Sequence, residues 1–262
     1  MASTLEAPNL PLFYKDLVPL NSKEHGKWST RTIDNAKFME GAHAIPLTAE
    51  EFVMASRNYP IIFSAGENSV PLALMGLNEG VNIFMDDKGK FADQVYIPAY
   101  VRRYPFMLAR LKQGEDELSL CFDPTSNAVG NYKKDAQPLF KDEKPTENTQ
   151  AILKFCEDFE QAGAKTQAFV QELEKEELLL DGEVSIQQTD IEKPFVYRGF
   201  KMVNEEKMRE LTGEKLRKMN QNGILPLIHA HLFSLQLMRE IFSQQVQQGK
   251  APQVTEAPKK AS

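Results

Sequence analysis

The residues that could do chemistry gather in one stretch, residues 96–106, which reads Tyr-Ile-Pro-Ala-Tyr-Val-Arg-Arg-Tyr-Pro-Phe. Arg102 and Arg103 carry planar guanidinium groups, which pair with carboxylates or phosphates through two parallel hydrogen bonds. Aromatic faces, on which a guanidinium or a flat ligand can stack, come from three tyrosines at four-residue spacing: Tyr96, Tyr100 and Tyr104. The stretch therefore predicts a clamp for an acidic group with aromatic walls.

Two prolines set the geometry that we expect for this clamp. Pro98 suits the first turn of a short helix, whereas Pro105 disfavours helical geometry at the residue before it. About two helical turns would place the three tyrosines on one side and turn Arg102 and Arg103 about 100° apart. One guanidinium would then face inward. It would either bind a ligand or, as a structural alternative, tie loop carbonyls together at a helix-to-strand corner.

Asp123, His25 and His231 are further candidates for a binding site. Asp123 follows a predicted strand, and it either points into a cleft or caps the turn there. His25 lies in an irregular segment, where it could act as a base. His231 falls on the apolar stripe of a predicted helix, which favours a core histidine over a catalytic one. His229 would point to the opposite side of that helix, so the two cannot share a metal ion.

Composition and missing motifs argue against several function classes. The net charge of −6 disfavours non-specific nucleic-acid binding, which depends on neutralising phosphates. Two cysteines, Cys121 and Cys156, are too few for a disulfide framework, and we expect free buried thiols. No phosphate loop, dinucleotide fingerprint or nucleophile elbow occurs. We therefore expect no catalytic residues, no metal ion and no cofactor.

We expect no secretory signal at the N-terminus and no membrane-spanning segment. The N-terminus lacks the basic and apolar regions of a secretory signal, and no apolar run approaches the roughly 20 residues of a membrane span. We therefore expect a cytoplasmic protein that does not span a membrane. Residues 1–16 are expected to form a flexible lead and residues 247–262 a disordered tail, which leaves residues 17–246 as a single domain.

Hydrophobic periodicity predicts an α+β fold, with a mainly antiparallel sheet and helices packed on one face. Thr48 and Glu51 form a capping box that starts a helix. Short β-branched and aromatic runs predict strands, the first three as a meander: residues 60–64, 72–77, 82–85, 106–111, 118–122 and 195–203. Apolar residues at three- and four-residue steps predict helices over 149–180, which Gly163 could divide, and over 224–242.

The chain resembles the SapC family of bacterial proteins from about Leu17 to Phe242. The most specific piece is the string Tyr96–Phe106 described above. The other pieces follow in order: Pro46-Leu47, Glu51-Phe52, Tyr59–Phe63, Gly76-Leu77, Asn82–Phe84, Leu120–Asp123 and His231–Leu235. The family takes its name from a gene associated with export of a surface-layer protein, and related genes lie near outer-membrane receptors and flavin-dependent halogenases. The resemblance transfers no catalytic residue.

These observations together favour an accessory protein over an enzyme. The resemblance implies a role in support of surface-layer or surface-protein export, with export or outer-membrane receptor machinery as partners. The clamp predicts a polypeptide or an acidic small molecule as the ligand. The alternative is an enzyme that acts on a peptide or small metabolite, linked to oxidative tailoring. It would need His25, Asp123 or His231 to converge with an arginine.

Overall fold

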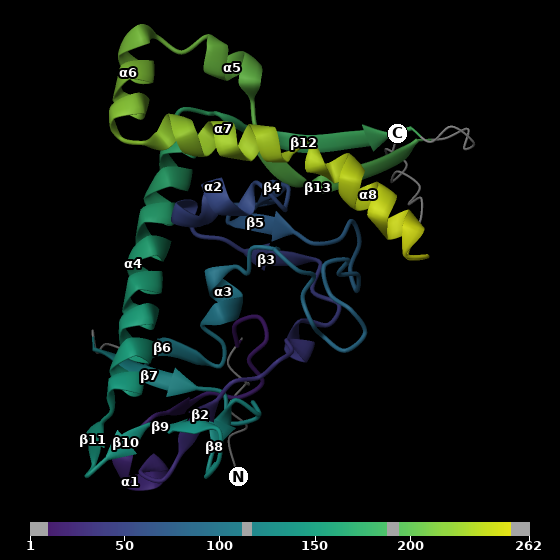
Figure 1. Cartoon of the computed structure of the whole chain (residues 1–262). Helices are drawn as coiled ribbons and strands as arrows, with labels where there is room; N and C mark the ends of the chain where they lie inside the picture. Colours follow the sequence, from purple (N-terminus) through teal and green to yellow (C-terminus); the bar gives the residue numbers. More distant parts are fainter. Residues whose placement is uncertain (1–9, 112–116, 188–193, 253–262) are drawn as a thin grey trace, which may run out of the picture. The chain divides into compact units, whose positions relative to one another are not determined.

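The computed structural model describes residues 10–111, 117–187 and 194–252 (Figure 1). The chain divides into two compact units. Unit 1 comprises Met1–Met39 and Tyr100–Gln161, and unit 2 comprises Glu40–Ala99 and Ala162–Ser262. Each unit contains antiparallel sheet together with helix, which confirms the α+β class. The single domain expected for residues 17–246 stays a prediction.

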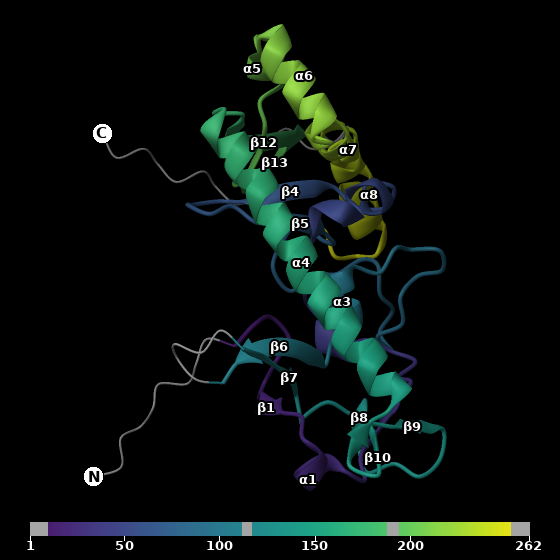
Figure 2. The ribbon, with the colours of Figure 1, turned by 90° about the vertical axis from the view of Figure 1, so that its left-hand side faces the viewer.

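Unit 1 contains two small antiparallel sheets and a hairpin. Figure 2 shows β1 near β7 and β6, in the order β1-β7-β6 of the first sheet. The elements are β1 (Val18–Pro19), α1 (Ser22–His25), β2 (Ser29–Arg31), η1 (Lys37–Met39), β6 (Phe106–Arg110), β7 (Leu118–Phe122), β8 (Val129–Gly130), β9 (Ala136–Pro138), β10 (Phe140–Lys141) and β11 (Lys144–Pro145). The buried core joins Phe106 and Phe122 to Leu139 and Cys156, with Trp28 packed against it.

Unit 2 is built on a five-stranded antiparallel sheet with the order β12-β13-β4-β5-β3. Its elements are β3 (Ala44–Pro46), η2 (Ala49–Glu51), α2 (Phe52–Ala55), β4 (Ile61–Ser64), β5 (Pro71–Leu74), β12 (Leu179–Ile186), β13 (Phe195–Val203), α5 (Glu205–Arg209), α6 (Gly213–Gln221), α7 (Ile224–Ser234) and α8 (Leu237–Gln247). Helix α7 packs against β4, β13 and α2. The capping box is present, because the side chain of Glu51 accepts from the backbone N–H of Thr48 at 2.9 Å.

Two elements run through the boundary between the units. Helix α3 (Ala99–Arg102) begins with the last residue of a unit 2 segment, and α4 (Glu147–Lys175) contributes residues to both units. Helix α4 is continuous in Figure 1, so Gly163 does not divide it. The predicted helical range to residue 180 was too long, because the chain turns at Glu177 (φ 52°) and then enters β12.

The predicted meander is wrong in its third strand. Residues 82–85 form no strand, and Met85 makes only an isolated bridge to Phe91. Strand β4 instead pairs with β5 on one side and with β13 on the other. Strand β7 pairs with β6 on one side and with β1 on the other, so β6 and β7 do not belong to the sheet of β4. A period-two pattern marks a strand, but it carries no information about the strand's distant partner.

The predicted helix over residues 224–242 is two helices, α7 and α8. The helical hydrogen-bond pattern tightens at Leu235 and Gln236, whose N–H groups bond to residues three positions back. Ser234 lies at this break. Its hydroxyl donates to the carbonyl of His231 at 2.6 Å and accepts from the N–H of Ile61 at 2.8 Å. A serine that bonds back to its own helix often bends it.

Residues 1–9 and 253–262 of the predicted lead and tail lie outside the described residues. Within the remainder of those ranges, Tyr14 is buried and donates to the carbonyl of Phe106 at 2.7 Å, and Gln248 donates to the carbonyl of Ile83 at 3.0 Å. Cys121 and Cys156 are buried and free, as predicted. In the described ranges, no helix combines the length and apolarity that crossing a membrane requires.

Candidate anion-binding site

Helix α3 is a single turn, so the predicted alignment of three tyrosines on two turns is wrong. Tyr96 precedes α3 and donates from its hydroxyl to Glu51 in unit 2 at 2.9 Å. The same carboxylate oxygen accepts from the N–H of Ala99, the first residue of α3, at 2.6 Å. Tyr100 and Tyr104 belong to unit 1. A buried carboxylate thus fixes the start of α3 and assigns Tyr96 a structural partner.

Arg103 lies in an aromatic cage within unit 1. Its guanidinium carbon is 4.3 Å from the ring centroid of Phe159, 4.6 Å from that of Tyr100 and 5.9 Å from that of Tyr14. Its Nη1 is 3.5 Å from Oε1 of Glu160, one residue along α4 from Phe159. The Arg103 side chain is only 6% exposed, whereas that of Glu160 is 44% exposed. The cation is therefore buried beside rings, and its counter-charge reaches solvent.

One N–H donor of this guanidinium, Nε, has no hydrogen-bond partner. Nε of Arg103 is buried and in this respect is unlike the other buried side-chain nitrogen and oxygen atoms of the described residues. A buried polar group left in this condition costs about 1–3 kcal/mol, and more when it is charged. Native proteins pair such groups with protein, water or ligand. The unfilled Nε is thus a place where the oxygen of an incoming anion would be stabilised.

The groups around Arg103 remain uncharged, apart from Glu160. Burial raises the pKa of Tyr14 and of Tyr100 above the ordinary phenol value. Burial likewise raises the pKa of the Cys156 thiol to about 11, although the positive charge of Arg103 partly opposes the shift. Neutral phenol and thiol groups do not compensate a guanidinium. The phenols and the thiol therefore add no negative charge beside Arg103, and its ion-pair partner is Glu160.

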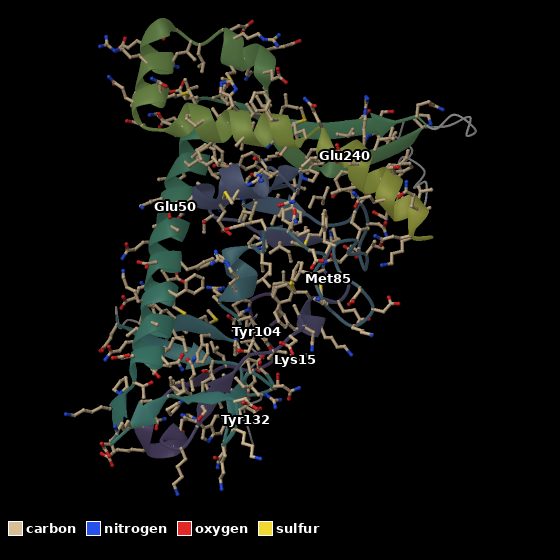
Figure 3. All side chains as sticks on the ribbon, viewed as in Figure 1. Lys15, Glu50, Met85, Tyr104, Tyr132 and Glu240 are labelled. Atoms are coloured by element: carbon tan, nitrogen blue, oxygen red, sulfur yellow. The ribbon has the colours of Figure 1, made fainter. Side chains whose placement is uncertain are left out.

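Asp123 caps the turn that follows β7, which was one of its two predicted roles. It is fully buried, and its Oδ1 accepts from the N–H and hydroxyl of Thr125 at 2.8 and 2.7 Å. Its Oδ2 accepts from the N–H of Lys15 at 2.8 Å and lies 3.4 Å from the hydroxyl of Tyr104. Figure 3 labels Tyr104 and Lys15, the two residues that approach this oxygen.

Arg102 differs from its neighbour in exposure. Its side chain is exposed, and its guanidinium carbon lies 5.3 Å from the ring centroid of Phe155. Arg103 is buried one residue later. The two consecutive arginines therefore face different surroundings, and Arg103 lies one residue beyond the end of α3.

The two histidine candidates lie in apolar surroundings of their own. His25 accepts at Nδ1 from the N–H of Asn21 at 3.2 Å, and its ring packs edge-on against Trp28 and Phe122. His231 belongs to unit 2, where Nε2 accepts from the N–H of Val203 at 3.0 Å. Within unit 1, the partners of the His25 side chain are Asn21, Trp28 and Phe122 rather than Arg103. In the described part of the chain, no group of three His, Cys, Asp or Glu residues could hold a metal ion.

The histidine of unit 2 is a neutral core residue. Burial lowers the pKa of His231 to about 4. Its Nδ1 lies 2.7 Å from the carbonyl of Ile61, while Nε2 accepts a hydrogen bond, so the neutral tautomer carries its proton on Nδ1. Both ring nitrogens have partners, as expected for a histidine on an apolar stripe.

No local pattern in the sequence connects Arg103 to three of its neighbours. Phe159 and Glu160 lie in the predicted helix over residues 149–180, and Tyr14 lies in the predicted lead. They lie 56, 57 and 89 residues from Arg103 along the chain (159 − 103, 160 − 103 and 103 − 14). The local spacing around residues 96–106 holds no signal for them.

The family comparison confirms the resemblance suggested by the sequence. The SapC family model matches residues 20–241. The chain belongs to the SapC family. The SapC match includes α3 and the whole of α4, and with them Arg103, Phe159 and Glu160, whereas Tyr14 precedes it. No curated protein and no solved structure matches the chain.

Proposed function

We propose that this SapC-family chain is a binding protein that recognises an acidic group through Arg103. One observation carries the proposal: a buried guanidinium has an unfilled Nε in a cage of three aromatic rings. The acidic group belongs to a polypeptide or to a small molecule. Its oxygen would accept from Nε while the rings exclude water, which strengthens a charge-assisted hydrogen bond.

The structural alternative has less support. An arginine that tied loop carbonyls together would donate to them, yet Nε of Arg103 donates to no atom of the described residues. The ion pair with Glu160 is long at 3.5 Å, and its carboxylate reaches solvent. Exposed ion pairs contribute about 0–1 kcal/mol. This pairing is a weak reason to bury a charge.

The proposed cellular role rests on the family resemblance. It is support of surface-layer or surface-protein export by a cytoplasmic accessory protein. No specific observation favours the rival role, an enzyme that acts on a peptide or small metabolite. His25 and Asp123 have partners of their own in unit 1, and His231 is a satisfied core histidine in unit 2.

The test is a titration of the full chain with N-acetylglutamate, followed by NMR of the arginine Nε–H groups. We expect a saturable shift of the Arg103 Nε–H resonance at millimolar ligand. Arg102→Met is the matched control, because it removes the neighbouring, exposed guanidinium, and it should bind like the parent chain. Arg103→Met should not bind. Equal binding by both variants, or no saturable shift in the parent chain, would contradict the proposal.

A further inference from the structure

Residues 11–15 form a strap whose backbone is held by two side chains of unit 1. The carbonyl of Leu12 accepts from the hydroxyl of Tyr100 at 3.1 Å. The N–H of Lys15 donates to Oδ2 of Asp123 at 2.8 Å. These two side chains bind backbone groups, because the phenol donates to a carbonyl and the carboxylate accepts from an amide. Every extended segment offers such groups, so this binding does not depend on its sequence.

The strap's side chains reach the cage. Phe13 packs edge-on against Tyr100, with ring centroids 5.8 Å apart, and against Phe38 at 5.2 Å. Tyr14 packs edge-on against Tyr104 at 5.3 Å, and its ring centroid is 5.9 Å from the guanidinium carbon of Arg103. The strap therefore presents an aromatic ring to the cation and no carboxylate.

The backbone of the strap is strained at its centre. Phe13 has φ of 80°, a left-handed conformation that is unfavourable for a bulky residue. Such conformations persist only where surrounding contacts enforce them. Leu12, the preceding residue, leaves 44% of its surface exposed. The strain opposes the contacts that hold the strap, which include the hydrogen bond from the Tyr14 hydroxyl to the carbonyl of Phe106, and it therefore favours exchange of the strap for another segment.

We propose that the Arg103 site takes an extended polypeptide segment with an acidic side chain, and that the strap occupies this site in the free chain. The inference rests on the proposed function and specifies its ligand as a polypeptide. The incoming backbone would replace the strap on Tyr100 and Asp123. Its carboxylate would reach the unfilled Nε of Arg103, which Tyr14 leaves without a partner.

Two blocked five-residue peptides copied from the strap test this exchange in the full chain. The first is acetyl-Pro-Leu-Phe-Tyr-Lys-amide, and the second carries Glu in place of Tyr. We expect the Glu peptide to bind more tightly, because only its carboxylate can accept a hydrogen bond from Nε of Arg103. Phe13→Ala removes the two aromatic contacts that Phe13 makes with Phe38 and Tyr100, so the site should be open more often and the affinity should rise about tenfold. Leu12→Ala, which keeps the carbonyl, should change affinity less than about twofold.

Amide hydrogen exchange of residues 11–15 provides the second measurement. The exchange should be faster in Phe13→Ala without ligand, and faster in the parent chain once the Glu peptide binds. If the peptide binds but exchange of the strap does not change, or if Phe13→Ala binds no better than the parent chain, the strap does not occupy the site. If neither peptide nor N-acetylglutamate binds any form, the proposed function itself fails. If N-acetylglutamate binds and the peptides do not, only the polypeptide inference is wrong.

Discussion

Arg103 and Glu160 form an ion pair in which the arginine side chain is buried and the glutamate side chain is exposed to solvent. Their closest charged atoms are 3.5 Å apart, but the arginine side chain is 6% exposed and the glutamate side chain is 44% exposed. Solvent screens the glutamate and offers it hydration when it turns away, whereas the arginine has no such alternative. Glu160 is therefore a replaceable partner, and a ligand anion would compete with it for the same cation.

Glu160→Gln should strengthen ligand binding. The substitution removes the competing carboxylate while it keeps the length of the side chain, so the affinity for N-acetylglutamate should rise several-fold. The free energy of unfolding should fall by less than about 1 kcal/mol, because the pair is partly exposed. Calorimetric titration and urea unfolding measure the two effects.

Glu157→Gln is the matched control for this prediction. It removes an exposed carboxylate from the same helix and should leave the affinity unchanged. If both variants bind more tightly by the same factor, the gain comes from net charge rather than from competition for Arg103.

Local sequence signals predicted local structure well. The Thr48 and Glu51 box marked the start of a helical segment, and the β-branched run before Ser64 marked β4, because capping and strand propensity act between near neighbours. The sheet partners could not be predicted in the same way. Strand β13 pairs with β4 across more than a hundred residues of chain, and only tertiary packing selects that pairing.

In the candidate site, too, the local contacts could be predicted from the sequence and the distant ones could not. Tyr100 and Arg103 are three residues apart, so their contact arises within α3 and the turn that follows it. The third tyrosine of the predicted row, Tyr96, is instead bonded to Glu51. Phe159, Glu160 and Tyr14 come from segments that no local pattern connects to Arg103. The arginine was therefore predictable, and its cage was not.

His231 should make the stability of the protein depend on pH. Burial lowers its pKa to about 4 in the folded chain, against an ordinary value of 6.5. Between these values the unfolded chain binds more protons than the folded chain, so stability rises with pH in that window. The contribution is complete above pH 6.5 and is lost as the pH falls towards 4, by about 3 kcal/mol in total.

Urea unfolding at several pH values between 4 and 7.5 measures this contribution. His231→Gln should be less stable at pH 7.5, because it disrupts the bonds to Val203 and Ile61, and its stability should depend less on pH in this window. His229→Gln, at an exposed position of the same helix, should keep the parent's dependence. Parallel pH curves for the parent chain and His231→Gln would show that other groups cause the acid sensitivity.

Two glycine substitutions should change stability in opposite directions. Gly163 lies inside α4, and a Cβ added there meets no heavy atom within 4 Å. Because alanine restricts the unfolded chain and favours helix, Gly163→Ala should stabilise the protein by about 0.5–1 kcal/mol.

A Cβ at Gly182 in β12 would lie 2.2 Å from Cε2 of Phe200, which is only 2% exposed. Gly182→Ala should therefore cost about 1–3 kcal/mol through overpacking. Urea midpoints of the two variants and the parent chain measure both effects, and a loss of stability in Gly163→Ala would mean that α4 needs a glycine at this position for close packing.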